Sequence, residues 1–378
     1  MLKRLNFSQV QHSHGVTCDS YTSMPVTTGY EKVVAHRTSD LFATTAKLKG
    51  KVIAKNSYSI VVEFEDGSVK SVELGRRYGK AAGATIPHDV ITDLSEGDTV
   101  DPGRVIAWDQ KHFEKDILDP LSVRWKVGKM VKVALVDGAD TFEDSDAISE
   151  RVAKDLGTET TYVRNLVINF DQRIVGLVKE GQHIEPDGIL CTIQDSVTTG
   201  TGLFDDAVTI QTLQMLSDAT PKAKHRGTVE KIEVVYNGEI EEMDESLQAI
   251  AMYSDRRLSK VSSALGKPKL TGKVDGAYRV EGKKLQKNQV AILVHITSNI
   301  KAGVGDKFVF GHQLKSITCR VMTGINRTES GIDLDALFGW QSVANRIVNS
   351  PVDLGTACTV LIEGGKMAVK IYEELTDE

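Results

Sequence analysis

The stretch "GVGDKFVFGHQLKSITCRV", residues 303–321, places Lys307 and Lys315 eight residues apart in a segment that otherwise looks buried. If this segment is a loop between two strands, both ammonium groups can converge on one anionic ligand. Two opposite unit charges about 4 Å apart attract by roughly 4 kcal/mol at an effective dielectric constant near 20, and like charges buried without a partner are costly. The stretch therefore indicates an anion site, unless both side chains simply extend to the solvent.

The charge balance of the whole chain is acidic, with 46 Lys and Arg against 52 Asp and Glu in 378 residues and a formal net charge of −6. Free-standing nucleic-acid-binding proteins are usually basic, so this balance disfavours that class but allows local basic patches. Basic stretches occur at 47–55, 221–227 and 256–287, and each is also typical of a solvated surface. The length predicts two or three packed units.

The chain has no apolar run of about 18 residues that would span a membrane, and its polar opening "MLKRLNFSQVQHSHG" does not resemble a secretion signal. The four cysteines lie far apart without a C-x-x-C pair; they are Cys18, Cys191, Cys319 and Cys358. We interpret them as reduced thiols of a cytosolic protein, and neither as zinc ligands nor as a disulfide framework.

Strand patterns cover most of the chain and predict a mainly β protein with a few helices (α+β). Residues 51–74 alternate β-branched and polar residues around Asp66-Gly67, which is a two-residue hairpin signal. Helical patterns are few, at 145–156, 203–218 and 244–265.

One internal repeat links "SEGDTVDPGRVIAW" (95–108) with "KEGQHIEPDGILCT" (179–192). Glycine and proline in both copies predict tight β-hairpins that enter a strand. The pattern also occurs in biotinyl and lipoyl carriers, which need a lysine at the tip of a companion hairpin. Because neither copy has a lysine at its tip, we interpret the repeat as architecture.

An acidic cluster, Glu143, Asp144 and Asp146, lies in "DTFEDSDAISERVAKDL" (140–156), where we expect a strand-to-helix turn. Helix N-termini favour acidic residues, so capping and solvation explain the cluster without any function. The alternative is a carboxylate that approaches Mg²⁺ or a metal-bound triphosphate, because hard cations bind oxygen ligands.

Seven segments carry motifs in an order that one known family shares. "FED" followed by "ISER" (142–151) is similar to FEDA-x-x-ISER, and "VGDKFVFGHQLKS" (304–316) is similar to VGDK-(M/L)-x-x-RHGNKG. Both motifs belong to the β subunit of multisubunit DNA-dependent RNA polymerases. Five further segments resemble that subunit in the same order, at 27–40, 74–107, 176–193, 225–235 and 349–355.

The resemblance covers the C-terminal half of a β subunit, most like the split β subunits of giant bacteriophages. It implies a double-psi β-barrel, built from strands around 128–150 and 290–325, together with barrel-sandwich-like hairpins and a flap. The implied organisation begins with an N-terminal β-rich segment that contains a barrel-sandwich-like hairpin (1–127) and a first barrel part with the FED motif (128–151). A flap or wall region follows (152–300), and a second barrel part carries the VGDK motif and the C-terminal segment (301–378).

The resemblance also implies roles for particular residues. Lys307 and Lys315 would bind the RNA 3′ end and nearby phosphates, with His312 and Arg320 as further nucleic-acid-binding residues. The catalytic set would also contain Glu143 and Asp144, with Asp144 approaching the substrate-bound Mg²⁺ directly or indirectly. The chain departs from the family at three places: Gly311 replaces the arginine of RHGNKG, Gln313-Leu314 replaces its Gly-Asn pair, and Pro351 replaces the arginine of VPSRMNIG.

The implied function is that of a β-type polymerase subunit, a nucleotidyltransferase that is inactive alone because the chain contains no D-x-D-G-D motif. The principal Mg²⁺ ligands would lie on a partner β′-type subunit. Other expected partners are the N-terminal part of β, template DNA, nascent RNA, NTPs and an initiation factor at the flap, but no membrane. The expected location is the host cytoplasm, and the virion is a second one.

Two other functions compete with the polymerase interpretation. A self-sufficient metal-dependent phosphoryl transferase would need its own acidic cluster, and three nearly consecutive acids are too few to surround a metal ion. A carrier-like or structural β-rich phage protein would use the same β-rich architecture without chemistry at the two lysines.

Overall fold

The computed structural model describes residues 18, 20–81, 84–195, 220–311, 314–346 and 349–376. Within these residues the protein is mainly β, with several sheets and few helices, as the sequence predicts. All four cysteines are free thiols. No helix in the described part is long and apolar enough to cross a membrane. The helix predicted at 203–218 lies outside the described residues.

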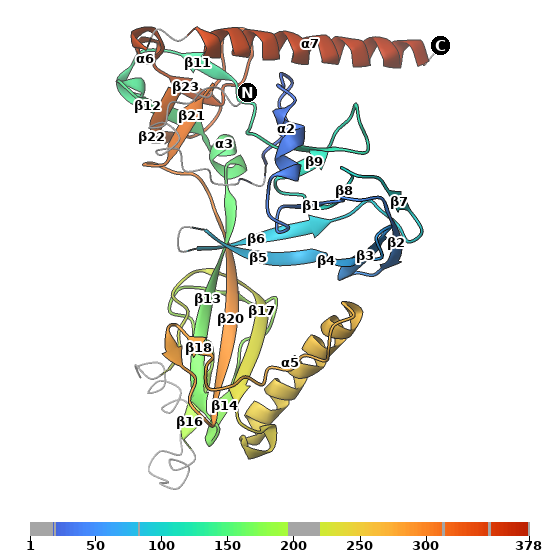
Figure 1. The fold of residues 1–378 in the computed structure, drawn as a ribbon. Coiled ribbons are helices and arrows are strands. Elements are labelled where there is room, and N and C mark those ends of the chain that lie inside the picture. Colours follow the sequence, from blue (N-terminus) through green and yellow to red (C-terminus); the bar gives the residue numbers. More distant parts are fainter. Residues whose placement is uncertain are drawn as a thin grey trace.

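The largest sheet has eight strands and occupies the middle and lower part of Figure 1. Its spine is the antiparallel pair β13 (Thr158–Asn169) and β20 (Gln289–Ile300), joined over their whole length. Both strands are rich in β-branched residues, which favour this pleated conformation. The other strands are β1 (Ala43–Thr45), β5 (Gly75–Ala81), β6 (Ala84–Ile91), β8 (Val105–Asp109), β15 (His183–Ile184) and β17 (Gly227–Asn237).

Arg76 connects the N-terminal strands of this sheet to its spine. Its guanidinium lies 3.0 Å from Asp89 on β6, 3.0 Å from Glu159 on β13 and 2.6 Å from Glu230 on β17. All four side chains are about three-quarters buried, so the charges are partly shielded from solvent. The planar guanidinium, with its several donors, suits such a three-way bridge.

A separate five-stranded sheet has the order β11-β23-β12-β22-β21. Strand β12 runs parallel to β22 and antiparallel to β23, and β21 forms a hairpin with β22. Among the described residues, these strand pairings do not close into a barrel. Residues 289–300, which were expected to be part of the barrel, belong to the larger sheet instead. The strands are β11 (Val133–Leu135), β12 (Ser145–Ser149), β21 (Lys307–Phe310), β22 (Leu314–Met322) and β23 (Ala336–Phe338).

The remaining strands form smaller sheets. The predicted Asp66-Gly67 hairpin is confirmed, because the strands on either side of it pair and Gly67 has a φ of 77°. The four-stranded sheet contains β4 (Val69–Glu73), β3 (Ser59–Phe64), β2 (Gly50–Lys55) and β7 (Thr99–Val100). The two-stranded sheets are β9 (Phe113–Lys115) with β10 (Val123–Trp125), β14 (Gln172–Val175) with β16 (Thr192–Asp195), and β18 (Arg279–Val280) with β19 (Lys283–Lys284).

The helix predicted at 244–265 is confirmed as α5 (Glu245–Ala264). Asp244 caps it by accepting a hydrogen bond from Ser246 N–H at 2.9 Å. Leu247 and Ala251 are buried in the core shared by α5 and the long strands, so the apolar stripe faces β17 and β14. Shorter helical elements are α2 (Tyr30–Val33), η1 (Val34–His36), η2 (Ala139–Thr141), η4 (Ile240–Glu242) and α6 (Trp340–Asn345).

The helix predicted at 145–156 is shorter than expected, because residues 145–149 form β12 and the helix α3 spans only Glu150–Asp155. Ser149 caps it by accepting from Val152 N–H at 3.2 Å. Glu143 and Asp144 therefore precede a strand and Asp146 lies within it, so the acidic cluster is not at a strand-to-helix turn. Sequence reasoning also missed α7 (Ser350–Thr376), because its glycines and β-branched residues weaken the helical signal.

The first copy of the internal repeat pairs with the basic segment 46–52. Gly97 N–H donates to Val52 O at 2.9 Å, and Val52 N–H donates to Asp98 O at 2.8 Å. Further along, Gly103 N–H donates to Ala46 O at 2.9 Å.

The second copy makes the same hydrogen bonds with the basic segment 223–229. Gly181 N–H donates to Val229 O at 2.7 Å, and Val229 N–H donates to Gln182 O at 2.9 Å. Asp187 N–H donates to Ala223 O at 2.9 Å. The repeat therefore also includes "AKLKGKV" (46–52) and "AKHRGTV" (223–229). The basic segment comes before its turn in the first copy and after its turn in the second copy.

The two copies are not the predicted hairpins. Strands β7 and β8 belong to different sheets, as do β15 and β16, so each copy is a turn that carries the chain from one sheet to the next. Each basic segment contains one glycine, Gly50 or Gly227, at which a neighbouring strand passes closely. A Cβ there would lie 2.7 Å from Glu63 O in the first copy and 2.5 Å from Thr297 O in the second.

We predict that Gly227→Ala destabilises the protein by about 2 kcal/mol or more, because the added methyl group overlaps a backbone carbonyl that cannot move easily. Urea denaturation of the two proteins measures the difference. Gly303→Ala is the matched control, since a Cβ there meets no atom within 4 Å. Equal losses for both variants would contradict the close-packing explanation.

Candidate functional site

The two lysines that opened the sequence analysis lie on one face of the β21–β22 hairpin. Lys307 is opposite Ile317, and Val309 is opposite Lys315. Side chains alternate along each strand, so all four share a face. The lysines are diagonal neighbours, with Cα atoms about 7–8 Å apart.

The condition that this segment is a loop between two strands is not met, because most of it forms the two strands of the hairpin itself. Lys307 is exposed and Lys315 is half-buried, whereas the buried side chains Leu314, Ser316 and Thr318 occupy the opposite face. Alternation in a hairpin explains how one segment can look apolar and still present two cations. The energetic argument from two buried like charges therefore does not apply, but the convergence of both lysines on one face remains.

The FED segment lies beside this hairpin. Ile317 is opposite Lys307 on one side and opposite Ser145 on the other, so the three residues form a row across β21, β22 and β12. Two strand spacings separate the ends of the row by about 10 Å. Asp144 immediately precedes Ser145, and its backbone carbonyl accepts from Ile317 N–H at 2.9 Å.

Glu143 and Asp144 both have exposed side chains. Glu143 adopts a left-handed φ of 53°, and its carbonyl accepts a hydrogen bond from the Ser342 hydroxyl. The Asp144 carboxylate lies 2.6 Å from the guanidinium of Arg346, at the end of α6. Sequence reasoning missed Arg346, because nothing in "SVANRIVNSP" (342–351) indicates that its side chain reaches a carboxylate about 200 residues away.

Asp146, the third acid of the cluster, points to the opposite, buried face. It accepts hydrogen bonds from the Ser316 hydroxyl and, at 2.8 Å, from the Thr318 hydroxyl. Burial raises the pKa of Asp146 above its ordinary value, although these hydrogen bonds oppose the rise. Asp146 therefore joins β12 to β22 and is not available to a ligand on the lysine face.

Two of the family departures touch each other. Gly311 has a φ of 55°, and a Cβ at this position would lie 2.5 Å from the Cβ of Pro351. Pro351 is near the start of α7, where its missing N–H costs no helical hydrogen bond. The two positions at which the family has arginines are therefore packed together without side-chain cations.

Of the other two residues predicted to bind nucleic acid, His312 and Arg320, the structure describes only Arg320. His312 and Gln313 lie outside the described residues. Arg320 is about half exposed, and its guanidinium lies 2.7 Å from the carboxylate of Asp140.

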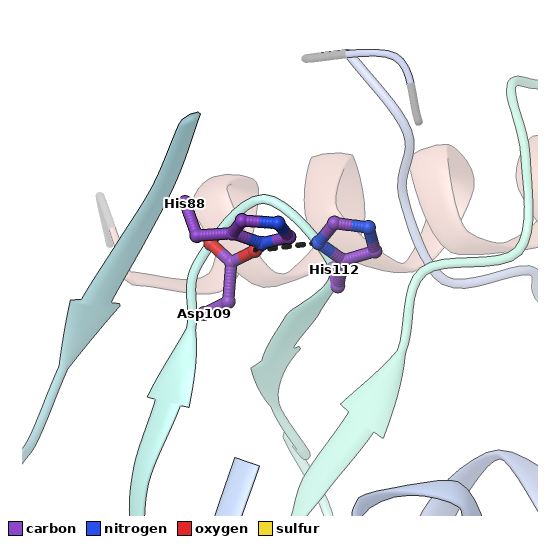
Figure 2. Close-up of side chains that lie close together, drawn as sticks. All are labelled: His88, Asp109 and His112. Atoms are coloured by element: carbon purple, nitrogen blue, oxygen red, sulfur yellow. Dashed lines mark hydrogen bonds and ion pairs between the residues drawn. The ribbon is translucent and has the colours of Figure 1, made fainter. Parts of the chain in front are cut away.

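A buried cluster of His88, Asp109 and His112 was not anticipated from the sequence (Figure 2). Asp109 Oδ2 lies 2.7 Å from His88 Nδ1 and 2.5 Å from His112 Nδ1. Its Oδ1 accepts from the backbone N–H groups of Asp89 and Lys111, both at 3.0 Å. Burial alone would raise the pKa of Asp109, but the hydrogen bonds from both imidazoles outweigh it and hold the pKa well below its ordinary value.

The geometry of this cluster is that of hydrogen bonds. Ligand atoms around a tetrahedral metal ion lie about 3.4 Å apart when each bond is about 2.1 Å, whereas the N···O distances here are 2.5 and 2.7 Å. Because the carboxylate is ionised, both Nδ1 atoms donate to it. Two nitrogen ligands also do not fit Mg²⁺, which prefers oxygen. The cluster therefore fastens the turn after β8 onto β6.

Neither the protein-family models nor the curated protein sequences contain a match to this chain.

We predict that Asp109→Asn lowers the free energy of unfolding by about 3 kcal/mol near neutral pH, because the variant breaks a buried, charge-assisted network. The folded-state pKa of Asp109 is depressed, so its contribution is present above the unfolded pKa of about 4 and is lost as the pH falls below it. Urea denaturation near pH 7 and near pH 3 should show the two proteins converging at low pH.

Asp101→Asn is the control for this charge change, because Asp101 is exposed in the turn before β8. If Asp109→Asn lowers the free energy of unfolding no more than Asp101→Asn does, the buried network does not stabilise the protein.

Proposed function

We propose that this chain is the C-terminal part of a β-type subunit of a multisubunit DNA-dependent RNA polymerase. The observation that supports this function best is the row formed by Lys307, Ile317 and Ser145. It brings together the two most specific motifs of the resemblance, although they are about 160 residues apart in the sequence. The role proposed for this chain within the enzyme is to hold and orient the reacting nucleotides.

Lys307 and Lys315 would bind the phosphates at the RNA 3′ end. The two residues are diagonal neighbours on one face of the hairpin, so one phosphodiester could bridge their ammonium groups. Val309 and Ile317, each 47% exposed, lie on the same face and would contact sugars or bases. Fixed cations of this kind stabilise the charge that develops during nucleotidyl transfer without moving.

Glu143 and Asp144 are the accessible carboxylates of this site, since Asp146 is buried on the other face. Two acids alone do not surround a metal ion, so the principal ligands would come from a partner chain. Mg²⁺, when bound, neutralises the triphosphate and stabilises both the attacking and leaving oxygens. Asp144 would have to leave Arg346 in order to approach a metal-bound substrate.

Arg346 is our candidate for the missing triphosphate contact. The family's two arginine positions are occupied by Gly311 and Pro351, which pack against each other. Arg346 stands five residues before Pro351 and already lies beside the FED segment. When Asp144 turns to the substrate, the guanidinium is released to bind phosphate oxygens.

The finer architecture belongs to the same proposal. The parallel pairing of β12 with β22 would form part of a double-psi barrel, and the two repeat copies would form barrel-sandwich modules. The region between residues 152 and 300 would be the flap, where an initiation factor binds.

Helix α7 supports the proposal of large partner subunits. It spans 27 residues, or about 40 Å, and extends along the top of Figure 1 beyond the five-stranded sheet. Cys358 is its one buried residue among those described, and large apolar side chains are exposed along its length. A heptad-like stripe repeats at alternating intervals of three and four residues: Leu354, Ala357, Leu361, Gly364, Ala368, Ile371 and Leu375. Such surfaces mark interfaces.

We predict that Lys315→Ala lowers the rate of RNA primer extension by the assembled enzyme on the order of 10²–10³-fold, because it removes a preorganised charge. Single-turnover extension of a pre-assembled primer measures this step. Lys301→Ala, at an exposed lysine just before the hairpin, should leave the rate unchanged. Normal extension by Lys315→Ala would rule out the proposed role of the hairpin.

We predict that Leu361→Asp with Ile371→Asp prevents this chain from co-purifying with its large partners. Both side chains are exposed, at 51% each, so the isolated chain should keep its melting temperature. Thr359→Asp with Lys366→Asp adds two acids to the polar face of α7 and should still allow assembly. Equal recovery of partners by both double variants would show that the apolar stripe is not an interface.

A further inference from the structure

The cleft between β13, β20 and the segments 224–225 and 278–281 has a volume of about 540 Å³ and lies outside the lysine hairpin. A volume of this size is typical of small-ligand sites. Its lining contains four cationic side chains, Lys80, Arg164, Lys224 and Arg279, and one acid, Glu281. In a chain with a net charge of −6, this concentration of positive charge is a local feature that favours an anionic ligand.

A planar surface lies in the same cleft. The rings of Tyr162 and His225 are stacked, with centroids 3.8 Å apart and an interplanar angle of 18°. His225 is exposed and Tyr162 is half-buried. Stacked rings beside cations are the combination on which nucleotide bases bind.

His295 also lines this cleft, but it lies apart from the stacked rings. This residue lines the cleft and is only 7% exposed. Its Nε2 lies 3.2 Å from Glu233 Oε2, whereas its Nδ1 has no hydrogen-bond partner. The hydrogen bond from His295 is the main reason that the pKa of Glu233 is lowered to about 2, so Nε2 donates to an ionised carboxylate. Val163 is opposite His295 and Tyr162 is opposite Ile296, so side-chain alternation places His295 on the other face of the sheet from the stacked rings, and it is not part of the proposed contact.

We propose that this cleft binds a nucleotide, with a base stacked on His225 and a phosphate held by Lys224 and Arg164. A free nucleotide and a nucleotide unit of single-stranded RNA share this chemistry. The site does not depend on the proposed polymerase function, because none of its residues belongs to the hairpin or the FED segment.

The internal repeat provides the matched control. Lys224 and His225 correspond to Lys47 and Leu48 in the first copy, where the same backbone hydrogen bonds occur without a histidine to stack. Substitutions at both pairs therefore change equivalent turns, but only the second pair lines the cleft.

The test uses the full chain carrying Lys307→Ala and Lys315→Ala, so that the hairpin lysines do not contribute. Fluorescence anisotropy follows a labelled 12-nucleotide single-stranded RNA, and calorimetry follows ATP. We expect His225→Ala and Lys224→Ala each to raise the Kd at least about fivefold, with melting temperatures unchanged. Lys47→Ala with Leu48→Ala should bind like the parent chain.

Binding of RNA that ATP displaces identifies a nucleic-acid site, and binding of ATP without RNA identifies a free-nucleotide site; both outcomes support the proposal. It is overturned if neither ligand binds, or if the cleft variants bind both ligands as well as the parent. It is also overturned if an acidic peptide displaces the RNA and binds His225→Ala with undiminished affinity. If the cleft binds no nucleotide but Lys315→Ala still slows primer extension, the cleft proposal fails and the polymerase proposal stands.

Discussion

The parallel pairing of β12 with β22 is the contact on which the candidate site depends. The two strands are far apart in the sequence, and Asp146 joins them by accepting hydrogen bonds from Ser316 and Thr318 across the buried face. Because side chains alternate, the same register places the half-buried Lys315 and the exposed Ile317 on the other face. A single structural arrangement therefore buries one acid of the FED segment and leaves Asp144 accessible beside the lysines.

The repeat shows a second constraint of the same kind. Gly50 and Gly227 allow a neighbouring strand to pass so closely that no side chain would fit, and the backbone hydrogen bonds around them are equivalent. The two copies nevertheless differ at their exposed positions. In the second copy, Lys224 and His225 line a cleft, whereas the first copy has Lys47 and Leu48. Shared backbone geometry thus carries different surface chemistry.

Local patterns were sufficient to predict the mainly β fold, the hairpin at Asp66-Gly67 and helix α5, because alternation, turn residues and helical spacing are local properties. Contacts between distant segments could not be predicted in this way. The pairing of Asp144 with Arg346 and the cluster at Asp109 depend on which strands become neighbours. Helix α7 was missed for a related reason, since glycines weaken its intrinsic propensity and its apolar stripe has no partner within the described residues.

The central claim is that the hairpin of Lys307 and Lys315 faces the RNA 3′ end. The most direct measurement is photo-crosslinking in the complex isolated from its native setting through a tag on this chain. The RNA primer carries 4-thiouridine at its 3′ terminus, and mass spectrometry locates the cross-linked peptide. Our account predicts a cross-link within residues 303–321. A cross-link that forms only elsewhere in the chain, or a complex in which this chain is never cross-linked, would contradict it.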